Sequence, residues 1–231
     1  MKNNICVVMQ PTYLPWSGFF NLIYQADYFV FLDDAQYSKN SWHNRNQIII
    51  HGEKSWITLP VEKNAELIYE KMPIYKSKWN IKHVKTLESN YGRHPYFDDI
   101  KPILSIIEKF SSETLSEINI ALIMKISQLL DIEVKFHLAS KIGVWGQRSE
   151  RLVDFSRCFH CDTYLSPIGS KEYLEEDGVF DNSDIILKYQ NFNPMIYEQK
   201  GTKEFIGYLS IVDVVANIGW VKAKDYIKGG V

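Results

Sequence analysis

The opening segment of the chain constrains its fold more than any other part. Residues 4–9 form a short apolar run that predicts a buried strand, Ser17 and Gly18 open a helix, and residues 28–32 form a second apolar run. A strand, a helix and a strand within such a short stretch are typical of a βαβ unit, whose two strands pair in parallel. The chain is therefore expected to contain a parallel sheet.

Strands and helices alternate again near the other end of the chain. Apolar runs and periodic stretches predict strands at residues 47–51, 55–61, 134–138, 163–166 and 185–189, and helices at residues 79–91, 96–110, 116–130, 149–159, 171–174 and 209–218. This order predicts an α/β fold with a layered, mostly parallel sheet. We expect one domain over residues 1–231, with a helical insert at about residues 77–131.

Charge and cysteine content narrow the functional classes. The net charge of -2 gives no general attraction to nucleic acid or to acidic lipid. No apolar run approaches the roughly 20 residues that span a bilayer, and the five apolar residues before Gln10 are too few for a secretion signal. Three cysteines do not make a disulfide framework. We therefore expect a cytoplasmic protein without a membrane span and without a nucleic-acid partner.

Polar residues follow three of the predicted strands, at the point where each strand ends. Gln10 follows the first strand, Asp33 and Asp34 follow the second, and Ser166 closes a later one. In a parallel sheet the carboxyl ends of the strands lie along one edge, and ligands bind there where the strand order reverses. We therefore expect these side chains to converge on one crevice.

The turn after the first strand combines rigidity with aromatic side chains and reads QPTYLPW. The chain is 14% aromatic, and tyrosine and tryptophan suit pockets that hold a base or a sugar ring. Two prolines stiffen the turn, and the helix start at Ser17 and Gly18 offers backbone N–H groups to an anion. We interpret Gln10, Tyr13 and Trp16 as site residues. The alternative is a rigid turn in which Trp16 fills the core.

Residues 33–46 carry many kinds of reactive side chain. The adjacent carboxylates of Asp33 and Asp34 repel each other, so one of them can act as a base, orient a hydroxyl or bind a metal. His43 titrates near neutral pH and can move a proton. With Gln10, these three are the candidate catalytic residues. No dedicated metal ligands are assigned.

The same segment offers groups that bind substrates. Lysine and arginine suit phosphate, and asparagine can bind a hydroxyl or a carbonyl. The candidate substrate-binding residues are therefore Tyr37, Lys39, Trp42, Asn44, Arg45 and Asn46. The alternative is a solvated loop in which Asp34 pairs with Arg45.

Three weaker signals lie further along the chain. Ser166 begins a turn of small residues that can admit a ligand, and Lys171 can reach a phosphate from it. Cys158 and Cys161 form a CxxC without a second pair, so we interpret them as structural. His83, beside two lysines on a predicted helix, is expected on a solvated face.

Six motifs, in order along nearly the whole chain, resemble those of the WbqC-like family of bacterial proteins. They read QPTYLPWSGFF, ADYFVFLDDAQYSKNSWHNRNQI, WITLPV, WNIKHVKTLESNY, RLVDFSRCFHCDTYLSPIGSKEYLEE and YLSIVDVVANIG. Pro167 and Ser170 stand where the family commonly has glycine. The first segments also faintly resemble the HIGH-type nucleotidyl-transferase fold, although residues 13–16 replace the paired histidines of that motif.

The resemblance implies a role in making O-antigen and other surface polysaccharides, with an acyl or aminoacyl group, such as glycyl, added to an amino sugar. The expected partner is a nucleotide-sugar substrate, and the expected donor is an acyl group activated on a carrier protein or on coenzyme A. On this hypothesis aromatic residues cradle the base or sugar, Lys39 and Arg45 hold the diphosphate, and His43 or Asp33 takes the amine proton. Gln10 or Asn44 would donate to the oxyanion.

Two other classes of function stay open on the sequence. One is an enzyme that activates a carboxylate or phosphate with a nucleotide, in which Asp33 and Asp34 hold Mg²⁺. The other is a non-catalytic scaffold of a glycan-synthesis complex.

Overall fold

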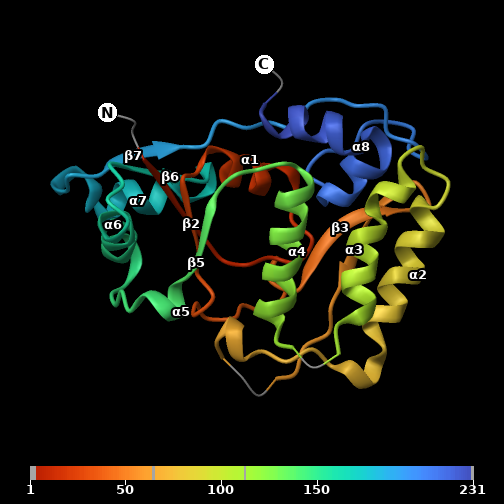
Figure 1. The fold of residues 1–231 in the computed structure, drawn as a ribbon, viewed down its shortest axis with the longest axis horizontal. Helices are drawn as coiled ribbons and strands as arrows, with labels where there is room; N and C mark the ends of the chain where they lie inside the picture. The colour runs from red at the N-terminus through yellow and green to blue at the C-terminus, as the bar shows by residue number, and fades with distance from the viewer. Residues whose placement is uncertain (1–3, 64–65, 112, 230–231) are drawn as a thin grey trace.

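The computed structural model describes residues 4–63, 66–111 and 113–229. Within these residues the central sheet has five strands in the order β5-β2-β1-β6-β7, and every neighbouring pair is parallel (Figure 1). The strands are β1 Ile5–Met9, β2 Tyr28–Phe31, β5 Lys135–Leu138, β6 Thr163–Ser166 and β7 Ile186–Tyr189. The chain moves from β1 to β2 and β5, and then returns to β6 on the other side of β1. The predicted α/β fold with a mostly parallel sheet is confirmed.

Both faces of the sheet are covered, as parallel strands require. Side chains alternate along β1, so Val7 packs into the larger core and Cys6 and Val8 pack into a smaller one. Helices α6, Arg148–Cys158, and α7, Lys171–Asp177, cover the smaller core, and α1, Ser17–Gln25, covers the larger one (Figure 1).

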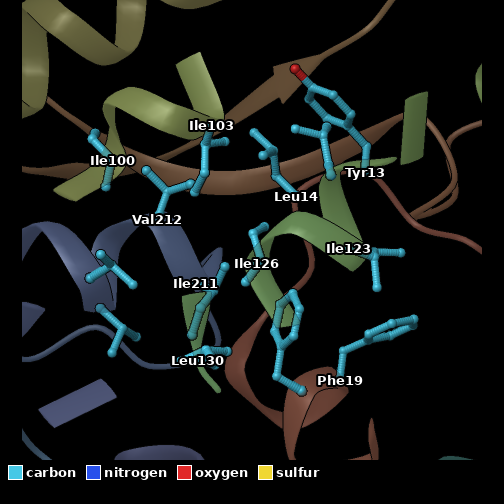
Figure 2. Packing of buried hydrophobic residues seen from close by; sticks show 14 of the residues in the cluster. Tyr13, Leu14, Phe19, Ile100, Ile103, Ile123, Ile126, Leu130, Ile211 and Val212 are labelled. Carbon is cyan, nitrogen blue, oxygen red and sulfur yellow. The ribbon is translucent and has the colours of Figure 1, made fainter. Parts of the chain in front are cut away.

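A helical layer completes the larger core. It contains α2, Trp79–Tyr91, α3, Phe97–Lys109, and α4, Leu115–Leu129, which all precede β5 in the sequence. Figure 2 shows isoleucines of α3 and α4 gathered around Leu14, Ile211 and Val212, and all of these side chains are fully buried. A capping box between Thr114 and Glu117 starts α4 by satisfying backbone N–H groups at its first turn.

The predicted hairpin is present but begins earlier than its pattern indicates. Strand β3, Arg45–Ile50, pairs antiparallel with β4, Glu53–Thr58, and the turn lies at His51 and Gly52. Both turn residues have positive φ, 53° and 82°, which is the backbone of a type I′ turn. Arg45 therefore belongs to a strand, which fixes the direction of its side chain.

The last helix, α8, Ile211–Ile227, extends well beyond the predicted residues 209–218. Gly219 interrupts it with a φ of 74°, and a Cβ there would lie 2.6 Å from the Tyr96 ring. A glycine accepts both the positive φ and the close approach of the Tyr96 ring. The helix bends at Gly219 and then continues to Ile227. Short elements are α5 Ala139–Ile142, η1 Ile68–Glu70, η2 Tyr75–Ser77, η3 Ile168–Ser170 and η4 Phe180–Asn182. No described helix has both the length and the apolar character needed to cross a membrane.

Candidate functional site

Gln10, which is half-buried, and His43, which is buried, form a pair at the carboxyl end of β1. His43 Nε2 lies 2.7 Å from Gln10 Oε1, and the backbone N–H of Ser38 donates to His43 Nδ1 at 3.4 Å. Since Nδ1 accepts, the ring proton sits on Nε2 and is donated to Gln10. The His43 side chain is only 3% exposed, and this burial lowers its pKa to about 4. The imidazole is therefore neutral at physiological pH.

Helix α4 holds the backbone around this pair. The side chain of Asn119, which is fully buried, donates to the carbonyl oxygen of His43 at 2.7 Å and to that of Pro11 at 3.1 Å. One amide thus joins the turn after β1 to the segment after β2. Asn119 lies on a predicted helix, and its position in the sequence offered no sign of this contact.

A cavity of about 580 Å³, here called the polar cavity, is lined in part by Tyr37, which packs against His43, and by Asn44, the next residue in the chain. The ring centroid of Tyr37 lies 5.7 Å from that of His43. Asn44 donates to the carbonyl oxygen of Leu59 at 2.7 Å, while its Oδ1 is buried and has no hydrogen-bond partner. The full lining is Gln36, Tyr37, Lys39, Asn40, Asn44, Pro60, Val61, Glu62, Lys63, Glu66 and Lys71.

A second hollow of about 220 Å³, here called the apolar pocket, is lined by Met9, Thr12, Trp16, Phe19, Trp42, Asn46 and Tyr208. Trp16 packs on Tyr208 with ring centroids 5.3 Å apart, and Trp42 packs on Trp56 at 5.2 Å. Met9 and Trp42 directly precede Gln10 and His43 in the chain. Both hollows are therefore lined by residues of the segment after β2, which also carries His43.

The two adjacent carboxylates bond to protein groups on other elements. Asp33 accepts from the backbone N–H of Ser140 at 3.0 Å and from its hydroxyl at 2.6 Å, at the start of α5. Asp34 accepts two bonds from the guanidinium of Arg151, at 3.1 and 2.5 Å. The partner of Asp34 is thus Arg151 rather than Arg45. Among the described residues, no group of three or more His, Cys, Asp and Glu side chains is arranged to hold a metal ion.

Arg45 lies along the hairpin. Its guanidinium carbon is 4.1 Å from the ring centroid of Trp56, and one of its terminal nitrogens donates to the carbonyl oxygen of Asn40. Its Nε is buried without a hydrogen-bond partner. The guanidinium stacks on an aromatic ring and does not line either hollow.

Asn46, a predicted binding residue, holds the backbone of the turn after β1 in place. Asn46 donates to the carbonyl oxygens of Tyr13 and Leu14 and accepts from the backbone N–H of Gln47. This holds Leu14 at a φ of 45°, a conformation that a leucine rarely adopts. Asn46 lines the apolar pocket, but its amide is already engaged in these hydrogen bonds to the backbone.

Tyr13 points into the core, where Figure 2 shows its ring above the isoleucines. Its hydroxyl lies 2.8 Å from His83 Nδ1, and His83 Nε2 lies 3.1 Å from the carbonyl oxygen of Thr58. A carbonyl only accepts, so His83 donates from Nε2 and accepts from Tyr13. Burial lowers the pKa of His83 to about 4. The expectation that His83 lies on a solvated face is wrong, because its side chain is only 7% exposed.

The residues after β6 do not join the hollows described above. Ser166 is fully buried and its hydroxyl lies 3.3 Å from the carbonyl oxygen of Pro167. Lys171 lies on α7, with its ammonium 3.7 Å from Glu175. In the CxxC, Cys158 is exposed, while Cys161 is buried and its hydrogen bond with Cys6 raises the pKa of Cys6.

A buried carboxylate on α8 was missed by sequence reasoning. Asp213 accepts from the hydroxyls of Tyr91 and Tyr197, at 3.0 and 2.5 Å, and from Gln199 at 2.7 Å. Its side chain is fully buried, and burial raises its pKa. This network ties the C-terminal segment to α2. A lone aspartate in an apolar helix pattern was the signal that could have found it.

Comparisons with known proteins find a matching family model and a related protein. A model described as the WbqC-like protein family matches residues 10–225. A protein of Mycobacterium tuberculosis (strain ATCC 25618 / H37Rv), named Uncharacterized protein Rv1507c, is 29% identical over 225 residues, which is 96% of this chain and 96% of the relative. No solved structure matches the chain, so the resemblance to the nucleotidyl-transferase fold is not confirmed.

Proposed function

Since the chain belongs to the WbqC-like protein family, we propose that it transfers an acyl or aminoacyl group to a nucleotide-linked amino sugar that is used to build bacterial surface polysaccharide. The observation that carries this proposal is the polar cavity, whose lining residue Tyr37 packs against His43 of the Gln10–His43 pair. A hollow of about 580 Å³ falls within the usual range for small-molecule sites, roughly 300–1,000 Å³.

The charges of the polar cavity suit a ligand with both phosphate and amine groups. Its lining includes the lysines Lys39, Lys63 and Lys71 and the glutamates Glu62 and Glu66. The ammonium groups attract a diphosphate, and the carboxylates attract the ammonium form of an amino sugar. A lining of one sign would favour phosphate or amine alone.

Aromatic and amide groups complete the proposed binding site. The Lys71 ammonium lies 4.9 Å from the centroid of the Tyr37 ring, so this ring stands between a cation and His43. Tyrosine presents an apolar face and a polar edge, which suits a sugar ring. Asn44 lines the cavity, and its buried Oδ1 has an unused acceptor capacity that a substrate hydroxyl or amine would satisfy if the side chain turned towards the cavity.

His43 is the proposed proton acceptor. Its neutral state at physiological pH follows from the pKa of about 4, and Gln10 holds the Nε2 proton. The hydrogen bond that Nδ1 accepts from the backbone N–H of Ser38 is long, at 3.4 Å. A small shift of the segment around Ser38 would expose Nδ1 to the attacking amine.

The alternative with Mg²⁺ on Asp33 and Asp34 has less support. Four hydrogen bonds from Ser140 and Arg151 already engage the oxygens of these carboxylates. A metal at this position would compete with an ion pair that is largely buried.

Binding and turnover together test the proposal. Calorimetric titration with uridine-diphosphate amino sugars should give a dissociation constant below millimolar, and Lys39→Ala should weaken it about tenfold, because a charge-assisted contact to phosphate is lost. Lys82→Ala is the matched control, since Lys82 is an exposed lysine on α2 outside the polar cavity.

Mass spectrometry should then detect an acylated sugar nucleotide when an activated donor is added. Absence of any nucleotide-sugar binding at millimolar concentration would overturn the proposal. Equal weakening by Lys39→Ala and Lys82→Ala would move the binding site away from the polar cavity.

A further inference from the structure

We infer that the apolar pocket binds the hydrocarbon part of an activated acyl donor, so that the protein selects a short-chain acyl group over a glycyl group. This inference rests on the proposed function, and it names the donor class that the proposed function leaves open. The evidence is the chemistry of the pocket wall, the way the wall is built, and its lining by Met9 and Trp42, the neighbours of Gln10 and His43 in the chain.

The wall offers carbon and almost no free hydrogen-bonding capacity. Met9, Phe19 and the rings of Trp16, Trp42 and Tyr208 form most of it. The amide of Asn46 is engaged by backbone groups, as described above. Within the part of the chain that the structure describes, no charged side chain lines the pocket. A glycyl ammonium placed there would exchange its hydration for the hydroxyl of Thr12 at most, with no carboxylate, whereas an alkyl chain would leave water at no such cost.

The pocket is a built feature, because three distant segments are fastened around it. The backbone N–H of Ile211 donates to Pro15 at 2.8 Å, and that of Ser210 donates to Gln47 at 2.8 Å. These bonds join the turn after β1, the start of β3 and the segment before α8. They place Trp16, Asn46 and Tyr208 on one wall.

Two backbone features hold the aromatic rings in place. A Cβ on Gly18 would lie 2.2 Å from the Trp16 ring, so the glycine lets the ring lie flat on the helix start. Tyr208 has a φ of 61°, which is unusual for a bulky residue. Such a conformation persists only where the surroundings impose it, and here it brings the Tyr208 ring against Trp16.

The mouth of the pocket faces solvent and its floor is buried. Trp42 is 47% exposed and Tyr208 is 53% exposed, while Phe19 at the floor is 3% exposed. A donor chain can therefore enter between two rings and end against Phe19. Met9 and Trp42 immediately precede the paired residues Gln10 and His43, so the pocket and the pair are built from the same two chain segments.

The reaction that this arrangement serves is amide formation from an acyl thioester. The amine of the sugar attacks the thioester carbonyl, a C–N bond forms, and the C–S bond breaks. The amine proton passes to His43 Nδ1 and then to the departing thiolate, so the products are an N-acyl sugar and a free thiol. No oxidant or reductant is needed.

A chain-length series tests the inference. Coenzyme A thioesters from acetyl to octanoyl should bind with a dissociation constant that falls about fourfold for each added methylene, until the pocket is full. Glycyl coenzyme A should bind no better than acetyl coenzyme A. Tryptophan fluorescence should change with the longer chains, because Trp16 and Trp42 line the pocket.

Variants locate the effect. Trp42→Ala should remove most of the chain-length dependence, while Trp145→Ala should leave it intact, since Trp145 is 84% exposed and outside the pocket. Thr12→Leu, which fills the pocket without opening the core, should shorten the longest chain that gains affinity. Circular dichroism of each variant establishes that it folds.

The outcomes separate this inference from the proposed function. A flat chain-length series with normal nucleotide-sugar binding would overturn the acyl pocket and leave the transferase proposal with a glycyl or other small donor. A steep series without nucleotide-sugar binding would support the pocket and overturn the proposed acceptor. A steep series that Trp42→Ala and Thr12→Leu leave unchanged would place the acyl chain outside the apolar pocket and overturn the inference.

Discussion

Two polar groups at the carboxyl edge of the sheet look alike in the sequence and differ in the fold. Asp33 and Asp34 bond to Ser140 and Arg151, which follow β5 and open the next helices of the chain. Gln10 and His43 bond to each other, and their chain neighbours Met9, Trp42 and Asn44 line two hollows. The first group fastens elements together, whereas the second leaves room for a ligand. Reactive residue types at a strand end therefore do not by themselves mark a site.

The largest expected effect concerns the fastening group. Asp34→Ala leaves the Arg151 guanidinium, only 16% exposed, without its carboxylate, and removal of one partner of a buried pair costs about 3–5 kcal/mol. We expect a loss of about 3 kcal/mol in the free energy of unfolding, measured with urea. Asp154→Ala is the control, because its ion pair with Arg157 is half exposed and should matter little.

Nucleotide-sugar binding per folded molecule should survive Asp34→Ala, since the residue lies outside both hollows. A loss of binding with normal stability would instead return Asp34 to the site and remove the contrast between the two groups.

The next effect follows pH. Both His43 and His83 have a pKa of about 4 in the folded protein, below the ordinary value near 6.5, because burial disfavours the charged ring. Between these values the unfolded chain binds more protons, so stability is complete above pH 6.5 and falls as the pH drops towards 4. Each histidine should contribute on the order of 2–3 kcal/mol to this fall.

His83→Gln should flatten the curve of unfolding free energy against pH while keeping an acceptor for Tyr13. His51→Gln, which changes a more exposed histidine on the hairpin turn, is the matched control. An unchanged slope in the His83 variant would mean that this ring is protonated as readily in the folded protein as in the unfolded chain.

A smaller effect is expected at the site pair. Gln10→Ala removes the acceptor that holds the His43 tautomer, so the proposed acyl transfer should slow about tenfold to a hundredfold. Gln10→Glu should instead stabilise a charged imidazole and shift the pH profile of the rate upward. Equal loss of rate in both variants, without any shift of the profile, would reduce Gln10 to a packing role.

The smallest effect separates Arg45 from the polar cavity. Arg45→Ala removes a stacking contact with Trp56 and should cost about 0.5–1 kcal/mol of stability. Its effect on nucleotide-sugar affinity should stay within about threefold, against about tenfold for Lys39→Ala. Isothermal calorimetry on both variants checks this, and a larger loss for Arg45→Ala would show that its guanidinium swings from Trp56 to the phosphate.

Much of the fold could be predicted because it depends on local pattern. The apolar runs that became β1, β2 and β6 are visible in isolation, and so are the periodic helices α2 to α4. The kink in α8 could not be predicted, because Gly219 is needed only where Tyr96 approaches it. The partners of Asp33 and Asp34 could not be predicted either, since they lie over one hundred residues away, as in the separation of 107 between Asp33 and Ser140.

For the candidate site, the sequence by itself determined which residue types stand at the carboxyl edge of β1 and β2, because strand ends and turn chemistry are short-range properties. Only the tertiary structure decided what each of them does. Tyr13 and Asn46 point inward, and Gln10 bonds to His43. Lys71 and Tyr208 line hollows that no local sequence pattern predicts. The physical reason is that a polar side chain takes the nearest partner in space, and the fold, not the order of residues, sets that distance.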